Sequence, residues 1–194
     1  CSLFARSGEV LAVILIADTI RATSAEAIAS LRARGLEVIM LTGDGPSAAR
    51  AVGEAVGVSR VVDSVRPEEK AAFVEGLQKD GRRVAMVGDG VNDAPALALA
   101  ELGIAMGSGT DVAAEAADIV LTRSDIASVV TALRLSRATL RTIKSNLFWA
   151  FAYNTVAIPV AVAGLLNPMI AGAAMAFSSV FVVLNSMRLT AFRK

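Results

Sequence analysis

One segment constrains the fold of this chain more than any other: Val84–Pro95, which reads VAMVGDGVNDAP. Its apolar beginning, Val84–Val87, predicts a short buried strand. The strand leads directly into the turn Gly88-Asp89-Gly90, and Asn92 and Asp93 follow before a helical stretch. In α/β sheets, ligands bind at loops that follow the carboxyl ends of parallel strands. The segment therefore predicts a strand, a ligand-binding loop and a helix in succession.

The side chains of this loop indicate which ligand it binds. Asp89, Asp93 and Asn92 supply carboxylate and amide oxygens, which suit a hard cation and Mg²⁺ above all. Gly88 and Gly90 allow backbone N–H groups to approach an anion closely. A surface turn rich in Gly, Asp and Asn explains the GDG triplet equally well, but it does not account for the full string. The loop predicts a site for magnesium and phosphate.

Predicted strands and helices alternate along the first 125 residues, which indicates a parallel sheet covered by helices on both faces. Glycines and prolines mark most of the boundaries. The expected strands are 10–17, 36–41, 61–62, 84–87, 103–106 and 119–121, and the expected helices are 24–34, 47–56, 67–80, 94–100 and 111–116.

The rest of the chain has a different composition. All 18 acidic residues lie at or before Asp125, and no charged residue occurs from Ser145 to Met187. That stretch is long enough for two membrane-spanning helices of about 20 residues each. We expect a stalk helix over 126–146, spans over 147–166 and 169–187, and a tail over 188–194. Basic residues before the first span and after the second predict that both ends are cytoplasmic.

Composition also excludes several classes of function. The net charge of +1 combines −2 in residues 1–144 with +3 in the remainder, so no basic face for nucleic acid is predicted. The chain has no histidine and a single cysteine, Cys1. Catalysis by histidine, zinc ligation by histidine and a disulfide framework are therefore excluded within these residues.

Polar side chains inside the expected spans are candidate ligands for a metal. Tyr153 and Asn154 lie in the first span, and Met175, Ser178 and Ser179 lie in the second. A thioether beside amide and hydroxyl oxygens favours a soft ion such as Cu⁺. The alternative is that the serines and the methionine only fill space between helices.

These motifs, taken in order, resemble the last third of a P-type ATPase of the heavy-metal-transporting subgroup, within the haloacid-dehalogenase-like phosphotransferases. Thr42-Gly43-Asp44 resembles the TGD motif of that family, whose threonine bonds the phosphoryl group. Lys70 resembles the lysine that neutralises phosphate charge, and Asp89 resembles the aspartate that binds Mg²⁺. Asn92 and Asp93 match the residues that complete the phosphate site, and Asp93 is a second candidate magnesium ligand.

The resemblance extends to the predicted membrane helices. Tyr153-Asn154 and the Met175-x-x-Ser178-Ser179 string look like the signature of the copper(I) branch, in which Tyr, Asn, Met and the second Ser are implicated in metal binding. Zinc and cadmium pumps are expected to carry a lysine and an aspartate in these helices. Neither occurs here, which favours copper over a divalent ion.

The family's architecture implies a haloacid-dehalogenase-like (Rossmann-like) parallel sheet that lacks its nucleophile strand, followed by a two-helix transmembrane hairpin. Residues 1–125 would form part of the phosphorylation domain, with 1–7 as the end of the nucleotide-binding domain. The implied cofactors are Mg²⁺ and ATP, with ATP bound mainly by the absent domain and Cu⁺ transported. The implied partners are the lipid bilayer, the upstream parts of the pump and a copper chaperone. The implied location is an inner or plasma membrane, with the soluble domain in the cytoplasm.

Other interpretations remain open at this point. The ion could be zinc or another divalent metal. The chain could instead be a non-catalytic membrane-anchored remnant or a regulatory module, and a membrane-anchored phosphatase is a further alternative. The nucleophile motif of the family, Asp-Lys-Thr-Gly-Thr, and its membrane Cys-Pro-Cys do not occur in these residues.

We predict that the 194-residue chain alone does not hydrolyse ATP, because phosphoryl transfer in this family needs the absent aspartate. The measurement is release of inorganic phosphate from ATP by the purified chain with Mg²⁺ and Cu⁺. Turnover above a protein-free control would contradict the prediction.

Overall fold

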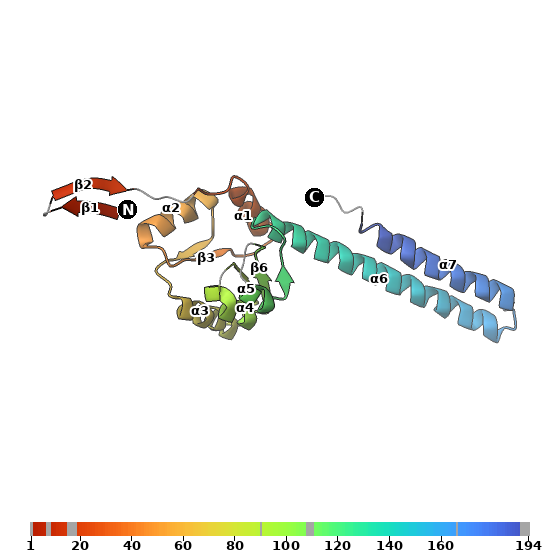
Figure 1. Cartoon of the computed structure of the whole chain (residues 1–194). Coiled ribbons are helices and arrows are strands. Elements are labelled where there is room, and N and C mark those ends of the chain that lie inside the picture. Colours follow the sequence, from red (N-terminus) through yellow and green to blue (C-terminus); the bar gives the residue numbers. More distant parts are fainter. Residues whose placement is uncertain are drawn as a thin grey trace. The chain divides into compact units, whose positions relative to one another are not determined.

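The computed structural model describes residues 2–6, 9–14, 19–89, 91–107, 111–165 and 167–190. These residues form two compact units, Cys1–Val129 and Val130–Lys194. Figure 1 shows the elements of both units.

The first unit begins with a β-hairpin. Strand β1 (Ser2–Arg6) pairs antiparallel with β2 (Glu9–Ile14), and the register shifts between Phe4 and Ala5. The strand that the sequence predicted from residue 10 is present as β2. The second strand was expected to extend to residue 17, but residues 15–18 lie outside the described part of the chain.

Strands and helices then alternate as the sequence predicts. The helix α2 begins with Pro46 at its first turn, and Gly57 closes it in the left-handed conformation (φ 75°), as is common after helix ends. In chain order the elements are α1 (Ser24–Arg32), β3 (Ile39–Leu41), α2 (Pro46–Val56), β4 (Arg60–Val62), α3 (Pro67–Lys79), β5 (Ala85–Gly88), α4 (Ala94–Leu99), β6 (Leu102–Ala105), α5 (Asp111–Glu115) and β7 (Ile119–Val120).

The parallel strands form two separate sheets. One contains β3 and β4, and the other has the order β5-β6-β7. Parallel pairing confirms the α/β class that the alternation predicted. In the described part of the chain, no strand pairs with both β3 and β5.

A small apolar core supports the three-stranded sheet. It consists of buried side chains from α3, β5, α4 and α5: Val74, Met86, Ala96, Leu97 and Ala113. Leu97 and Val74 are each only 1% exposed, so this packing fixes α3 and α4 beside the end of β5. That end carries the glycine-rich loop.

The second unit is a pair of long helices. Helix α6 (Ala127–Val162), whose first residues belong to the first unit, continues without a break through Pro159, and α7 (Pro168–Met187) follows after a short turn. The expected stalk and first span are thus one helix, which ends four residues before the predicted boundary at 166. Asn167 starts α7 by accepting a hydrogen bond from the Met169 N–H at 2.9 Å, as an N-cap residue does.

The membrane-spanning character expected for these helices is not supported. Among the described residues, no helix combines the length and the apolar character needed to cross a bilayer. The two expected helices are present as α6 and α7.

A hydrogen-bonded cluster, which we call the amide clasp, joins α6 to α7. It consists of Asn146, Asn185 and Ser186. Asn185 donates from Nδ2 to Oδ1 of Asn146 at 2.7 Å, and Asn146 donates from Nδ2 to the Ser186 hydroxyl at 3.0 Å. Next to the clasp, the rings of Trp149 and Phe181 meet edge to face with centroids 6.1 Å apart. The clasp and this ring pair hold the two helices side by side.

Asp125 caps the start of α6. Its Oδ1 accepts hydrogen bonds from the Ala127 N–H at 2.9 Å and from the Thr23 hydroxyl at 3.0 Å. The Ala127 N–H, followed by Thr23 and the nearby Arg21 and Arg123, lowers the pKa of Asp125 below its ordinary value. The ionised carboxylate therefore links the start of α1 to the start of α6.

We expect Asp125→Ala to lower the free energy of unfolding by about 1 kcal/mol at pH 7, because a helix cap is lost. The pKa of Asp125 is lower in the folded chain, so its contribution is complete above the unfolded pKa and disappears as the pH falls through the folded pKa. The measurement is urea unfolding of both proteins between pH 7 and pH 3.

Asp125→Ser is the matched control, since serine caps a helix without a charge. The difference in unfolding free energy between the parent chain and Asp125→Ser should change with pH, because the parent carboxylate titrates and the serine cap does not. A constant difference between the parent chain and Asp125→Ala at all pH values would contradict the assignment.

Candidate functional site

The glycine-rich loop lies at the carboxyl end of β5, where the sequence predicted it. After Gly88 the chain passes through a short 3₁₀ turn, Val91–Asp93, and continues directly into α4. Gly90 is outside the described residues. Asp93, at the end of the turn, is only 7% exposed, and a buried carboxylate needs hydrogen bonds or a cation.

Lys70 provides the cation for Asp93. Its Nζ lies 2.7 Å from Oδ1 of Asp93, with side chains 17% and 10% exposed. The other carboxylate oxygen, Oδ2, accepts the Asp89 N–H at 3.3 Å. Lys70 lies in α3, so one carboxylate ties α3 to the loop after β5. The sequence selected both residues but did not predict that they form an ion pair.

Gly88 is required by the closeness of this contact. A Cβ added at Gly88 would lie 2.6 Å from the Cβ of Asp93 and 2.7 Å from its Oδ2. Any side chain at this position would displace the carboxylate from Lys70. The first glycine of the motif therefore serves the packing of Asp93 against the end of the strand.

The remaining side chains of the loop, Asp89 and Asn92, are exposed to solvent. Each carboxylate oxygen of Asp93 accepts one hydrogen bond, from Lys70 and from the Asp89 N–H, so Asp93 holds Lys70 beside the loop. Among the described residues, no group of three or more acidic or cysteine side chains could enclose a metal ion. This arrangement fits Mg²⁺, which usually binds through one or two carboxylates, water and the substrate's phosphate oxygens, and Asp89 would be its carboxylate here.

The second predicted motif, Thr42-Gly43-Asp44, forms a tight turn at the carboxyl end of β3. The Thr42 hydroxyl donates to Oδ2 of Asp44 at 2.8 Å and accepts the Asp44 N–H at 3.1 Å. The Val65 N–H donates to the Thr42 carbonyl at 3.0 Å, and the Ser64 N–H donates to the Asp44 carbonyl at 2.9 Å. The loops after β3 and β4 therefore support each other.

Two of the candidate metal ligands, Asn154 and Ser179, form hydrogen bonds within their own helices. Asn154 donates to the Ala150 carbonyl at 2.9 Å, and the Ser179 hydroxyl donates to the Met175 carbonyl at 3.2 Å. Met175 is 72% exposed. The Tyr153 ring lies 6.0 Å from that of Trp149. Within the described residues, no hydrogen bond joins Tyr153 or Asn154 to Met175 or Ser179.

Sequence reasoning missed several polar contacts. Glu101 accepts the Val84 N–H at 2.6 Å, which, with Gln78 and other groups, lowers the pKa of that carboxyl and secures the start of β5. The amide clasp and the Asp125 cap were also missed. A Ser-Asp pair before a long helical pattern is a capping signal and could have predicted Asp125 as the cap of α6. No sequence pattern predicts the hydrogen bonds of the amide clasp.

Comparison with known proteins gives the family. A family model described as haloacid dehalogenase-like hydrolase matches residues 2–101, and a second with the same description matches residues 71–133. The first match covers more than half of the chain. The chain therefore belongs to the haloacid dehalogenase-like hydrolase family.

Individual proteins similar to this chain include copper-exporting and cation-transporting P-type ATPases. The copper-exporting P-type ATPase of Bacillus subtilis (strain 168) is 54% identical over 182 residues, which are 94% of this chain and 23% of that protein. The cation-transporting P-type ATPase B of Mycobacterium bovis (strain ATCC BAA-935 / AF2122/97) is 57% identical over 185 residues, or 95% of this chain and 25% of that protein. The chain thus spans about a quarter of the length of these relatives.

A solved structure shares the fold. The crystal structure of a zinc-transporting PIB-type ATPase in its E2.Pi state superposes with a TM-score of 0.83 and 39% sequence identity. The match covers 96% of this chain and 31% of that protein. Together the relatives establish similarity to part of a heavy-metal P-type ATPase, and their names differ in the metal.

We expect the Lys70–Asp93 pair to dominate the stability of the site. Lys70→Met or Asp93→Asn alone should lower the free energy of unfolding by roughly 3 kcal/mol, because each leaves a largely buried partner without its counter-charge. The double variant should lose less than the sum of the two. The measurement is a double-mutant cycle by urea unfolding, in which a coupling energy of at least about 1 kcal/mol is expected for groups in contact.

The control for this cycle is the exposed pair Lys79–Glu75, which spans one helical turn of the same helix at 2.8 Å. Its coupling should be only about 0.3–0.5 kcal/mol. Equal coupling energies for the two pairs would show that burial does not strengthen the Lys70–Asp93 interaction.

Proposed function

We propose that this chain is the part of an ATP-driven heavy-metal pump that supplies the phosphate and magnesium site of the phosphorylation domain, and that the metal exported is Cu⁺. The observation that carries the proposal is the Lys70–Asp93 pair held against the exposed Asp89 at the end of β5. The similarity to P-type ATPases over 94% of the chain supports it.

The position of Lys70 supports a role for this residue in stabilising the charge of a phosphoryl group. An ammonium group has three donors, and one of them is used on Asp93. The other two are available to phosphate oxygens, and the Asp93 contact fixes where they point. Such charge stabilisation from a held position is the main contribution of a protein to phosphoryl transfer. Bound Mg²⁺ would add further positive charge near Asp89.

A hydrogen bond to Asp44 constrains the Thr42 hydroxyl. Its hydroxyl has one proton, which it donates to Asp44 in this structure. A Thr42 hydroxyl that binds a phosphoryl oxygen must therefore release Asp44. The backbone of the loop stays in place because Val65 and Ser64 hold it through their N–H groups.

The copper proposal is supported by the side chains of α6 and α7. Met175 offers a thioether, which selects Cu⁺ over hard cations, and neither helix contains a carboxylate. The local hydrogen bonds of Asn154 and Ser179 use a donor of each side chain, so their oxygens remain able to accept or to ligate. Transport of zinc is the second candidate, favoured by the structural similarity to a zinc-transporting ATPase.

The test is a chimera in which this chain replaces the matching quarter of the Bacillus subtilis copper exporter. We expect Thr42→Ala and Asp89→Asn to lower formation of the phosphorylated enzyme by roughly 100-fold, the cost of removing one group that stabilises the transition state. Met175→Ala should leave phosphorylation by inorganic phosphate intact but weaken the dependence of turnover on Cu⁺.

Met169→Ala is the control for the metal site, because Met169 is also exposed on α7 (84%) but is not in the proposed ligand set. Unchanged copper-dependent turnover in Met175→Ala would overturn the copper assignment. Stimulation of the parent chimera by Zn²⁺ in preference to Cu⁺ would replace it with the zinc assignment.

A further inference from the structure

Helix α6 carries a row of cations that runs into an apolar surface on the same face. Arg137, Arg141 and Lys144 follow one another at spacings of four and three residues, so they lie along one side of the helix. All three are exposed. We call them the basic row, and the same side of the helix continues beyond Lys144 with aromatic and aliphatic side chains.

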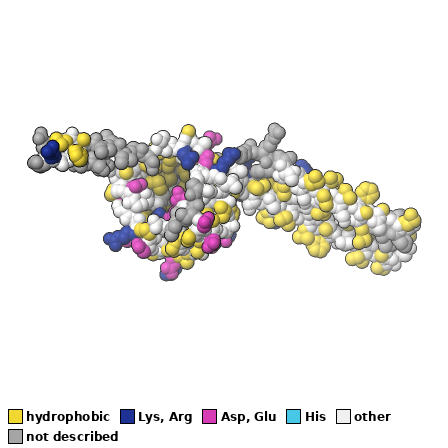
Figure 2. Space-filling model, in the orientation of Figure 1, with side chains coloured by type: hydrophobic (Ala, Val, Ile, Leu, Met, Phe, Trp, Pro, Cys, Tyr) yellow, Lys and Arg dark blue, Asp and Glu magenta, His cyan; other side chains and the backbone are white. Residues whose placement is uncertain are grey.

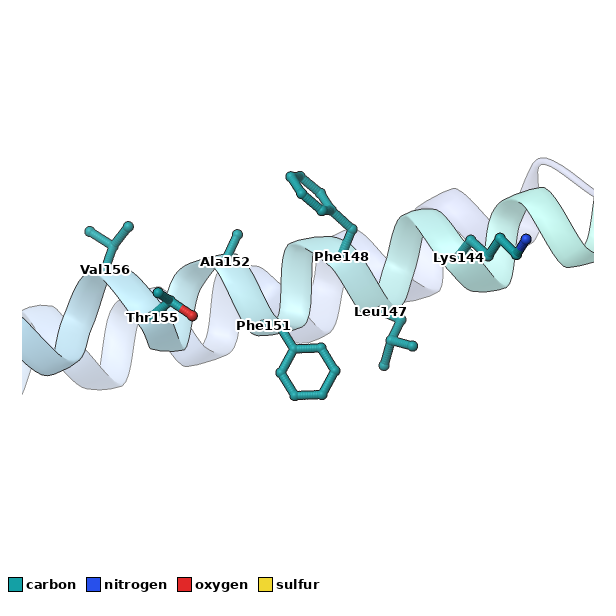
Figure 3. Close-up of a pocket in the computed structure, with 7 residues that line it drawn as sticks. All are labelled: Lys144, Leu147, Phe148, Phe151, Ala152, Thr155 and Val156. Atoms are coloured by element: carbon teal, nitrogen blue, oxygen red, sulfur yellow. The ribbon is translucent and has the colours of Figure 1, made fainter.

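These side chains form a shallow groove that begins at Lys144. Figure 3 shows Leu147 and Phe151 projecting on one side of it, and Phe148, Ala152 and Val156 projecting on the other. The groove has a volume of about 610 Å³, which is within the range of roughly 300–1,000 Å³ that ligand pockets occupy. Its walls are apolar along most of its length, and a cation stands at one end.

The basic row has no internal counter-charge. Within the described part of the chain, none of its three members forms an ion pair with an acidic side chain. The sequence contains no Asp or Glu after Asp125. In the space-filling view the acidic side chains lie on the first unit, and the hydrophobic side chains cover much of the helix pair (Figure 2).

We propose that the basic row and the groove together bind one anionic phospholipid, with its phosphate at Lys144 and Arg141 and an acyl chain along the groove. An amphiphile with a negative headgroup and an apolar tail matches both halves of this surface in the order in which they occur. A free phosphate ion would leave the groove uncovered, and a neutral apolar partner would leave the cations without a counter-charge. Basic clusters beside apolar helix segments bind anionic lipid in this way.

This surface is distinct from the magnesium and phosphate site, so the proposal does not depend on catalysis. The chain also contains a built-in reporter. Trp149 is its only tryptophan, and its ring lies 5.4 Å from that of Phe148, which forms one wall of the groove. A brominated acyl chain in the groove should therefore quench the tryptophan fluorescence by contact.

The experiment uses the full 194-residue chain in dodecyl maltoside micelles, titrated with dibrominated phosphatidylglycerol or with dibrominated phosphatidylcholine. Each basic residue near an anionic surface contributes about a fivefold preference. We therefore expect half-maximal quenching by phosphatidylglycerol at roughly a 100-fold lower mole fraction than by phosphatidylcholine. Raising the salt from 50 mM to 500 mM should reduce this preference by screening.

Two variants separate the halves of the site. The charge variant, with Arg137, Arg141 and Lys144 each changed to Gln, should bring the phosphatidylglycerol curve to the phosphatidylcholine curve. Ala152→Phe fills the groove and should reduce quenching by both lipids. The matched control changes three exposed cations of the first unit, Arg50, Lys79 and Arg83, to Gln and should retain the preference. Circular dichroism verifies that each variant keeps its helices.

Four results would overturn the proposal. The two lipids could quench the parent chain equally, or the preference could survive in the charge variant. Inorganic phosphate could abolish quenching by phosphatidylglycerol at constant ionic strength, which would identify a site for the free ion. Quenching by neither lipid would show that no acyl chain occupies the groove.

Discussion

The ion pair between Lys70 and Asp93 is the contact on which the rest of the candidate site depends. A carboxylate as buried as Asp93 is unstable without a cation and hydrogen bonds, and it has one of each, from Lys70 and from the Asp89 N–H. The pair fixes α3 against the loop after β5, and Gly88 leaves room for it. Because Asp93 occupies the interior, Asp89 is left at the surface, where a metal ion and a phosphate can reach it.

Much of the first unit could be predicted because residues with strong local conformational preferences lie at the ends of its helices. Pro46 and Pro67 begin helices and Gly57 ends one, and each has a conformational reason that does not depend on distant residues. The glycine-rich loop was located for the same reason. Its ion pair could not be predicted, since Lys70 and Asp93 are 23 residues apart and only the packing of α3 on α4 brings them together.

For the helix pair, the prediction made from amino-acid composition and the structure differ. A long stretch without charges predicted two membrane spans, but the described helices do not meet the requirements for a span. The polar residues that suggested a metal site bond to their own helices, as Asn154 does with the Ala150 carbonyl. Spacing along a helix identifies side chains that share a face, but it does not determine whether those side chains face a ligand, another helix or their own backbone.

The amide clasp has a mechanical consequence. In a hairpin that is otherwise held by apolar contacts, α7 could shift along α6 at little energetic cost, because one aliphatic surface resembles the next. Asn146, Asn185 and Ser186 remove that freedom, since a shift of one turn, about 5.4 Å, would break both clasp hydrogen bonds at once. The clasp therefore fixes the register of α7 along α6.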